Sequence, residues 1–208
     1  MKFIFIFIIS YLLGCIPWAY IFLKFIEGKD IREIGTGNVG AMNSYEITNK
    51  RWLGFTVMLM DASKGIVAVI ISYLIDTGSM ACVSIAGISV VFGHNYNIFL
   101  KFKGGRGLAT SSGVFLFLNP LFILSWLNIW MLSYFFIKKN FHIDNAIATI
   151  MTFVVYLIIP ENLFIKFNLL FVANKAQFGL LISIISCLIL LRHIEPLQIY
   201  FDENLSKN

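Results

Sequence analysis

The sequence is poor in charged residues, since Asp, Glu, Lys and Arg make up 13% of its 208 positions. Soluble globular chains carry roughly 25%, so there are too few polar groups to cover a surface that faces water. Hydrophobic residues account for 59% of the chain, and a bilayer accepts this surface through helical spans of about 20 apolar residues. The low charge excludes a soluble domain. It predicts an all-α, polytopic membrane bundle, with residues 1–208 forming a single integral membrane domain.

Cysteine is also scarce. Cys15, Cys82 and Cys187 all lie within or beside apolar runs, without the paired spacing of a disulfide framework or a zinc site. We expect three buried free thiols, no metal and no other cofactor. The sequence also lacks the Gly-x-x-x-x-Gly-Lys-Ser/Thr pattern of a nucleotide P-loop, so it gives no indication of an ATP or GTP site.

Apolar runs divide the chain into about seven transmembrane spans. Four runs are clear, and the segment Ala146–Leu191 holds either two long spans or three short ones, because Pro160-Glu161 and Asn174-Lys175 interrupt it. We expect the first run to remain uncleaved, because apolar residues continue beyond Cys15, where a signal sequence would end. The clear runs are Phe3–Phe25, Trp52–Ile75, Met80–Phe92 and Leu108–Ile137, and the three short spans would be Ala146–Ile159, Leu163–Val172 and Phe178–Leu191.

Charge predicts the orientation of these spans. Two spans separate the polar segment Glu27–Arg51 from the basic loop Lys101–Gly107, so both face one side, and with seven spans Arg192-His193 joins them. The other side has mainly Lys138 and Lys139. The positive-inside rule then places the N-terminus outside and the C-terminus in the cytoplasm. The net charge of +5 is thus explained by loops between spans, and we expect no nucleic-acid partner.

Two glycine-rich segments on this side have the composition of anion-binding loops. The first, GTGNVGAMN at residues 35–43, combines three glycines with a hydroxyl and two amides, so its backbone N–H groups can converge on an anion. The second, KFKGGRG at residues 101–107, adds cations and precedes a helix whose N-terminal amides favour a phosphate. The alternatives are an interhelical turn for the first loop and contact with anionic lipid headgroups for the second.

Three polar residues within or beside spans are further candidates. His94 ends an apolar run, where it can anchor the membrane boundary or, beside a phosphate site, accept a proton from a hydroxyl group. Asp61 and Lys64 are three residues apart and therefore share one helical face. They can form an inward-facing ion pair or line a site. His142 falls on the opposite side of the predicted membrane and has no predicted role.

The order of these motifs resembles the acyl-phosphate:glycerol-3-phosphate acyltransferase (PlsY) family. The matching segments are GTGNVGAMN, DASKG, GHNYNIFLKFKGGRGLAT and LRHIE, and the resemblance extends from Gly14 to about Glu195. It implies a seven-span enzyme of the bacterial cytoplasmic (inner) membrane with its active site at the cytoplasmic face. Such enzymes transfer an acyl group from acyl phosphate to the 1-hydroxyl of sn-glycerol 3-phosphate, giving lysophosphatidic acid and phosphate in the first step of phospholipid synthesis. The implied partners are both substrates, membrane lipids and an enzyme that produces acyl phosphate.

The resemblance also implies roles for individual residues. Glycerol 3-phosphate would bind at the second glycine loop and acyl phosphate at the first, with Thr36 where the family usually has serine. His94 would contact the phosphate or the hydroxyl near the reacting centre, and His193 would close the pocket. The catalytic residues are then His94, Thr36 and Asn38, the binding residues are Gly35, Gly37, Gly40, Asn43, Lys101, Lys103, Gly104, Gly105, Arg106, Gly107 and His193, and Asp61 and Lys64 are structural or line the site.

The chain departs from the family pattern at several polar positions. Glu46 stands where the family has arginine, Arg106 replaces the usual lysine, and Ala146 aligns with a serine. The family's terminal His-Arg-Glu-Asn becomes HIEP, so Ile194 and Pro196 replace a cation and an amide. The departures therefore remove polar contacts and reverse the local charge at Glu46.

Three hypotheses for function follow. The first is an active acyltransferase in which Lys50 or Arg51 supplies the missing charge, and the second is a catalytically impaired paralogue that binds phosphate headgroups. The third is a small membrane transporter that uses Asp61 and Lys64 as a coupling pair, although the sequence shows no inverted repeat. An enzyme should gather its polar residues at one membrane face, whereas a transporter should hold them near the midplane.

Overall fold

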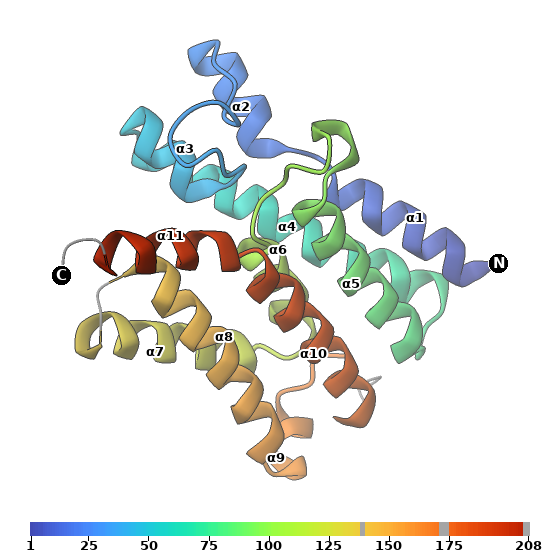
Figure 1. The fold of residues 1–208 in the computed structure, drawn as a ribbon. Coiled ribbons are helices and arrows are strands. Elements are labelled where there is room, and N and C mark those ends of the chain that lie inside the picture. Colours follow the sequence, from blue (N-terminus) through green and yellow to red (C-terminus); the bar gives the residue numbers. More distant parts are fainter. Residues whose placement is uncertain (138–139, 171–174, 206–208) are drawn as a thin grey trace.

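The computed structural model describes residues 1–137, 140–170 and 175–205, and all regular secondary structure within these ranges is helical (Figure 1). This confirms the predicted all-helical fold. The elements are α1 (Lys2–Gly14), α2 (Trp18–Glu27), α3 (Ala41–Thr48), α4 (Arg51–Ile75), α5 (Met80–Asn95), the short 3-10 helix η1 (Ile98–Leu100), α6 (Leu108–Leu118), α7 (Leu121–Phe136), α8 (Phe141–Ile158), α9 (Glu161–Lys166), α10 (Lys175–Leu191) and α11 (Ile194–Leu205).

Four helical stretches in the described residues are long and apolar enough to cross a bilayer, namely Lys2–Glu27, Arg51–Ile75, Met80–Leu100 and Phe141–Ile158. Helices α10 and α11, which are bent by 43° relative to each other, would form a fifth. Large hydrophobic side chains on the outer faces of these helices are exposed, among them Phe55, Leu157 and Leu180. Such surface needs lipid around it, because water disfavours contiguous exposed apolar patches.

The first apolar run contains a helix break. Helix α1 ends at Gly14 and α2 begins at Trp18, because Pro17 has no backbone N–H to donate into a continuous helix. At this break the carbonyl groups of Gly14 and Ile16 both accept hydrogen bonds from Lys64 of α4. A local effect of one proline thus ties the N-terminal helices to a buried cation.

The predicted single span Leu108–Ile137 is wrong, because the structure divides it into α6 and α7. Asn119, which precedes Pro120, has extended backbone angles (φ −154°, ψ 95°), as steric contact with a following proline ring favours. Helix α6 starts directly after the second glycine loop, and His142, at the start of α8, contacts Arg106 of that loop. The chain of α6 and α7 therefore returns to the end of the molecule from which it starts.

The predicted location of His142 on the opposite side of the membrane is also wrong, because this residue lies beside the second glycine loop. Lys138 and Lys139 lie outside the described residues.

The region between α8 and α10 contains one short helix and no third span in its described part. Helix α9 has six residues and is about 9 Å long, against a hydrocarbon core of about 30 Å. After it, the N–H of Leu169 donates to the carbonyl of Leu118 at the end of α6. The predicted short span Leu163–Val172 is therefore wrong for residues 163–170, and residues 171–174, with the predicted break at Asn174, lie outside the described residues. Two long helices occupy Ala146–Leu191, as the alternative prediction had it.

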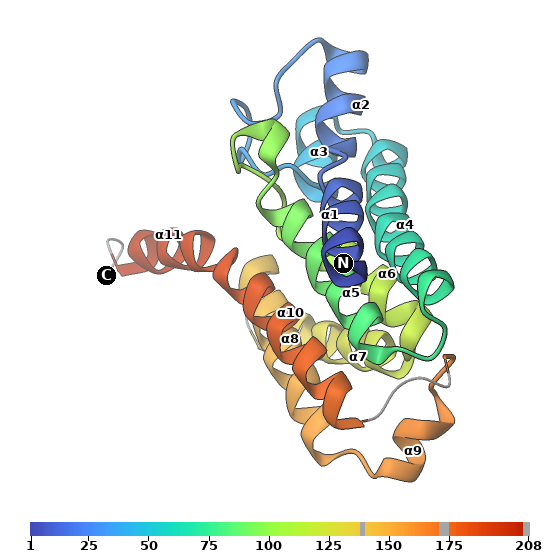
Figure 2. The same cartoon turned by 90° about the vertical axis from the view of Figure 1, so that its right-hand side faces the viewer.

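Glycines allow the helices that carry the polar residues to approach closely. A side chain at Gly65 of α4 would overlap the backbone of Thr110 in α6, and one at Gly113 would overlap the carbonyl of Ala62. Likewise, a side chain at Gly14 would overlap the backbone of α5. Small residues at membrane helix contacts commonly have this purpose. They bring α1, α4, α5 and α6 together in the upper part of the bundle, while α10 lies between α5 and α8 (Figures 1 and 2).

The three cysteines are free thiols, as predicted, but they differ in burial. Cys15 and Cys82 are buried, whereas Cys187 is exposed on α10. The prediction of a buried Cys187 is wrong, because this residue lies on the outer face of its helix. An apolar surrounding for that face would have to come from lipid.

Candidate functional site

The two glycine loops meet at Gly105. A side chain there would overlap the carbonyl oxygen of Val39 in the first loop and the imidazole ring of His94 at the end of α5. A side chain at Gly104 would overlap the carbonyl oxygens of His94 and Asn95. The two consecutive glycines thus allow backbone from three segments to come together, and the N–H of Gly105 donates to the carbonyl of His94 at 3.0 Å.

Asn43 organises the first glycine loop from within. It is buried, its side-chain oxygen accepts from the N–H of Thr36 at 3.0 Å, and its amide group donates to the carbonyl of Asn38 at 2.9 Å. Gly35 and Gly37 have positive φ angles of 59° and 68°, which glycine adopts without steric cost. The amide of Asn43 therefore holds the loop, whereas Thr36 and Gly35 are exposed and Asn38 is half-buried. Gly40 caps the start of α3.

The second glycine loop is fixed by an arginine that follows α10. Nε of Arg192 donates to the carbonyl of Gly105 at 3.1 Å, and its terminal nitrogen donates to the carbonyl of Gly104 at 3.0 Å. The guanidinium also lies 5.7 Å from the ring centre of Tyr96. Sequence reasoning used Arg192 only as an orientation signal. Its position directly before His193 was the one available hint of a role in the site.

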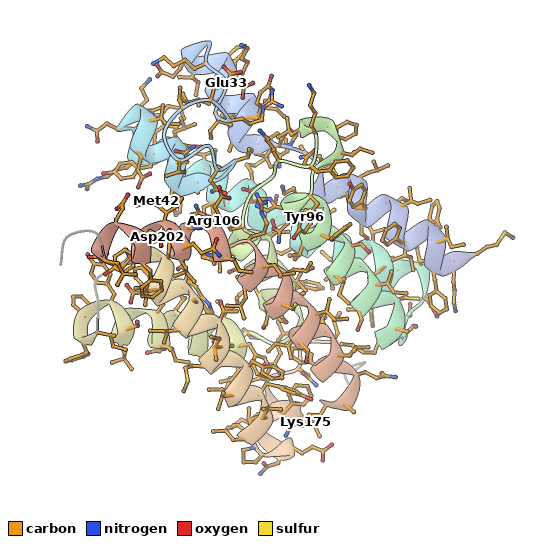
Figure 3. The ribbon with its side chains drawn as sticks, in the orientation of Figure 1. Glu33, Met42, Tyr96, Arg106, Lys175 and Asp202 are labelled. Carbon is orange, nitrogen blue, oxygen red and sulfur yellow. The ribbon has the colours of Figure 1, made fainter. Side chains whose placement is uncertain are left out.

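Arg106 is the partly buried cation of this loop. One of its terminal nitrogens donates to Nδ1 of His142 at 3.3 Å. Burial and the neighbouring Arg192 lower the pKa of Arg106 to about 10, and Glu46 and Glu195 oppose that shift. The guanidinium is therefore still charged at neutral pH. Figure 3 shows Arg106 between Met42, Tyr96 and the start of α11, far from Lys175 at the other end of the molecule. Lys101, Lys103 and Phe102 of the same loop are exposed, and Gly107 is buried.

His94 lies over a buried ion pair. The ammonium of Lys64 is 2.7 Å from a carboxylate oxygen of Asp61 and 3.2 Å from Nδ1 of His94. The same ammonium donates to the carbonyls of Ile16 and Gly14. The predicted inward-facing Asp61–Lys64 pair is thus present, and it lies directly behind a predicted catalytic side chain. Sequence spacing placed the pair on one helical face, but it gave no sign of the contact with His94, which is 30 residues away.

His193 is buried where α10 gives way to α11. Its Nδ1 donates to the carbonyl of Ile189 at 2.8 Å, its Nε2 is 3.5 Å from the amide nitrogen of Asn145, and its ring centre is 6.1 Å from that of His142. Through His142 it is one contact away from Arg106. Sequence reasoning missed both Asn145 and His142, because their role depends on the return of α7.

The predicted site residues therefore gather at one end of the molecule. His94, Arg106, His193 and the two glycine loops belong to one set of contacts, and Asp61 and Lys64 support it from below. Exposed backbone, two lysines and an arginine favour a doubly charged anion such as a phosphate. Among the described residues, no group of three His, Cys, Asp or Glu side chains could hold a metal ion.

Comparison with known proteins finds similar sequences. The sequence profile of the family described as Glycerol-3-phosphate acyltransferase matches residues 4–203. The Glycerol-3-phosphate acyltransferase of Thermoanaerobacter sp. (strain X514) is 48% identical over 116 residues, which is 55% of this chain and only 56% of that relative. The Glycerol-3-phosphate acyltransferase 2 of Thermotoga maritima is 33% identical over 195 residues, or 92% of this chain and 89% of the relative.

The fold is also similar to a solved structure. The crystal structure of PlsY (YgiH), an integral membrane glycerol 3-phosphate acyltransferase in its glycerol 3-phosphate form, superposes with a TM-score of 0.80. The two sequences are 26% identical, and the match covers 98% of this chain and 94% of that one. A second structure of the same protein in its lysophosphatidic acid form gives a TM-score of 0.78.

Proposed function

The chain belongs to the glycerol-3-phosphate acyltransferase family and is an integral membrane acyltransferase, and we propose that it transfers an acyl group from acyl phosphate to the 1-hydroxyl of sn-glycerol 3-phosphate. The observation that carries this proposal is the convergence of both glycine loops on His94 at one end of the bundle. The comparisons support neither an impaired paralogue nor a transporter. A transporter would also hold its polar residues near the midplane.

The reaction requires two anion sites in contact with each other. The hydroxyl oxygen of glycerol 3-phosphate attacks the carbonyl carbon of acyl phosphate, the bond from that carbon to the phosphate oxygen breaks, and the products are lysophosphatidic acid and phosphate, which together carry the hydroxyl proton. Because acyl phosphate is an activated mixed anhydride, the protein has mainly to align the hydroxyl and stabilise developing negative charge. Two adjacent loops that bind phosphate groups meet this requirement.

The described contacts support a division of roles between the loops. We assign glycerol 3-phosphate to Arg106 and the second glycine loop, with Lys101 and Lys103 at its exposed edge. We assign acyl phosphate to the first loop, where Thr36, Asn38 and the glycines can reach an anion. His94 lies where the loops meet, and the buried His193 closes the pocket at the start of α11. Asn43 contributes by holding the first loop in shape.

We further propose a seven-span topology that differs from the one read from the sequence. The spans are α1, α4, α5, α6, α7, α8 and α10, with α6 and α7 as two short helices, so the site and His142 face the cytoplasm. The N-terminus is then outside and the C-terminus inside a bacterial cytoplasmic membrane, as the positive-inside rule favours. Residues 1–208 form one domain, surrounded by membrane lipids and supplied by an enzyme that makes acyl phosphate.

The activity is tested directly with purified full-length protein in lipid nanodiscs. Acyl phosphate and labelled glycerol 3-phosphate should give labelled lysophosphatidic acid, and acyl-CoA should not replace acyl phosphate. His94→Ala serves as the control, because it removes the side chain at the junction of the loops. Product formation no greater than that of His94→Ala would contradict the proposal.

The acidic residue Glu46 should weaken substrate binding. Its negative charge acts to raise the pKa of Arg106, and Lys50, one of the two cations expected to compensate for it, is already paired with Glu27 at 2.7 Å. A bound phosphate beside Arg106 would be repelled by this carboxylate. Glu46→Gln is therefore expected to lower the KM for glycerol 3-phosphate about threefold at low ionic strength and less at high salt, because exposed charges are screened.

The control for this prediction is Glu33→Gln, which removes an exposed acidic residue on the far side of the first loop from Arg106 (Figure 3). Steady-state kinetics at two salt concentrations should show no change for this variant. An unchanged KM in Glu46→Gln as well would mean that the phosphate does not bind beside Arg106.

A further inference from the structure

Lys64 makes more contacts than an ion pair requires. Its side chain and that of Asp61 are only 3% and 4% exposed, and its ammonium faces one carboxylate, two carbonyls and a ring nitrogen of His94. A ring N–H at this place would set one donor against another, because an ammonium has three N–H donors and no lone pair. The group on the histidine that faces Lys64 must therefore present a lone pair.

This contact specifies which nitrogen of His94 carries the hydrogen. An ammonium can only donate, so Nδ1 at 3.2 Å has to accept. The carboxylate oxygen of Asp61 is 3.6 Å from Nδ1, too long for a hydrogen bond that would hold a proton there. In the neutral ring the hydrogen must then be on Nε2.

A second proton on the ring is opposed by its surroundings. An imidazolium would place another positive charge beside Lys64, and the carboxylate that the structure shows nearest to the ring is that of Asp61, at 3.6 Å. That carboxylate is already paired with Lys64. Asp61 therefore has no free charge with which to stabilise an imidazolium.

The Nε2 edge of the ring faces the junction of the two glycine loops. A side chain at Gly105 would overlap Nε2 and the adjacent carbon of the ring, and only glycine leaves that edge free. Among the residues that the structure describes, Nε2 has no hydrogen-bond partner, although 92% of the His94 side chain is buried, since it is 8% exposed. Nε2 lies at the accessible edge of this otherwise buried side chain, so its N–H faces the place assigned to the substrates and can donate to an anion bound there.

We infer that Lys64 is a positioning residue that fixes His94 as the Nε2–H tautomer, so that His94 donates a hydrogen bond to an anionic oxygen of the bound substrates and does not take the hydroxyl proton. The inference rests on the proposed function for the identity of those substrates. It reverses the usual arrangement of a carboxylate behind histidine, in which Nδ1 carries the hydrogen and Nε2 is left as a base. Here the group behind histidine is a cation.

The tautomer is measured by 15N NMR of histidine-labelled full-length protein in nanodiscs. The chain has three histidines, so the signals of His94 are assigned by their loss in His94→Ala. We expect a protonated Nε2 and a lone pair on Nδ1. A protonated Nδ1 with a lone pair on Nε2 in the unaltered protein would overturn the inference.

Kinetics of a donor-only replacement provide a second test. The side-chain amide of His94→Gln can donate from about the position of Nε2 but cannot take up a proton at pH 7. It should keep kcat within about tenfold of the unaltered enzyme, whereas loss of a general base costs roughly 10²- to 10⁴-fold. A His94→Gln enzyme as inactive as His94→Ala would contradict donation as the role of His94.

The role of Lys64 is isolated with a matched pair of variants. Lys64→Met alone would leave a buried carboxylate unpaired and could unfold the protein, so the double variant Asp61→Asn/Lys64→Met is compared with Asp61→Asn, in which the carbonyls of Gly14 and Ile16 still accept from Lys64. Thermal unfolding of both variants is measured on the same samples. The double variant should show Nδ1 protonation and a kcat about tenfold lower, with the KM for glycerol 3-phosphate unchanged. Asp61→Asn, which keeps Lys64, should retain the Nε2–H tautomer, and equal spectra for the two variants would exclude Lys64 as the cause.

These outcomes separate the inference from the proposed function. If the unaltered protein forms lysophosphatidic acid but shows the other tautomer, the function stands and the inference fails. If it shows the Nε2–H tautomer but forms no product, the positioning by Lys64 stands and the assigned substrates are wrong.

Discussion

Gly105→Ala is expected to reduce acyl transfer about a hundredfold, the loss that a displacement of roughly 1 Å at a reacting centre can cause. The added methyl group would overlap the imidazole of His94 and the carbonyl oxygen of Val39. Neither can move easily, since His94 is held by Lys64 and Val39 is buried in the first glycine loop. The loops would have to separate, and the two bound substrates with them.

This prediction is checked by initial rates, with thermal unfolding in detergent measured on the same samples. Gly28→Ala is the matched control, because Gly28 follows α2 at the same end of the molecule and a side chain there meets no atom within 4 Å. Its positive φ of 69° makes alanine unfavourable by roughly 1 to 2 kcal/mol. Full activity in Gly105→Ala would show that the loops do not meet at His94.

Arg106→Gln should raise the KM for glycerol 3-phosphate about 10- to 150-fold with a smaller change in kcat. A hydrogen bond to a charged group contributes on the order of 1.5 to 3 kcal/mol, and each 1.4 kcal/mol corresponds to about tenfold in affinity. Glutamine can still reach toward His142 but has no charge. Because burial and Arg192 lower the pKa of Arg106 to about 10, the affinity of the unaltered enzyme should fall as the pH rises through about 10, where this arginine loses its charge.

Two further variants serve as controls for the Arg106→Gln prediction. Arg106→Lys keeps the charge and should retain part of the affinity, although lysine lacks the planar fork of donors that arginine presents. Lys29→Gln removes an exposed cation that belongs to neither glycine loop and should leave the KM unchanged. An unaltered KM in Arg106→Gln would remove Arg106 from the glycerol 3-phosphate site.

Electrostatics around Arg106 also help to explain how the chain accommodates Glu46. Arg106 and Arg192 are neighbouring cations, but Arg192 is held by the carbonyls of Gly104 and Gly105. Glu46 and Glu195 offset part of this positive charge. Of the two cations expected to replace the family's arginine, Lys50 is paired with Glu27, which leaves Arg51 at the start of α4.

The sequence by itself determined the membrane class, the two glycine loops and the Asp61–Lys64 pair. These depend on composition and on local spacing, because apolar runs require lipid, glycines in a short segment free the backbone, and residues three apart share a helical face. The same local signals led to errors wherever a run of apolar residues was taken as one helix. Asn119-Pro120 breaks such a run without any loss of hydrophobicity, so it did not appear as a boundary.

Only the tertiary structure decided which polar residues meet. The return of α7 brings His142 to Arg106 over 36 residues, the end of α10 brings Arg192 to the glycine loop over 87, and α4 brings Lys64 to His94 over 30. Contacts between residues so far apart in the sequence depend on how the helices cross, and the close approach at Gly65, Gly113 and Gly14 sets these crossings. No short sequence pattern predicts these contacts, because each helix is apolar enough to pack against several other helices. Which helices pack together depends on the packing of the whole bundle.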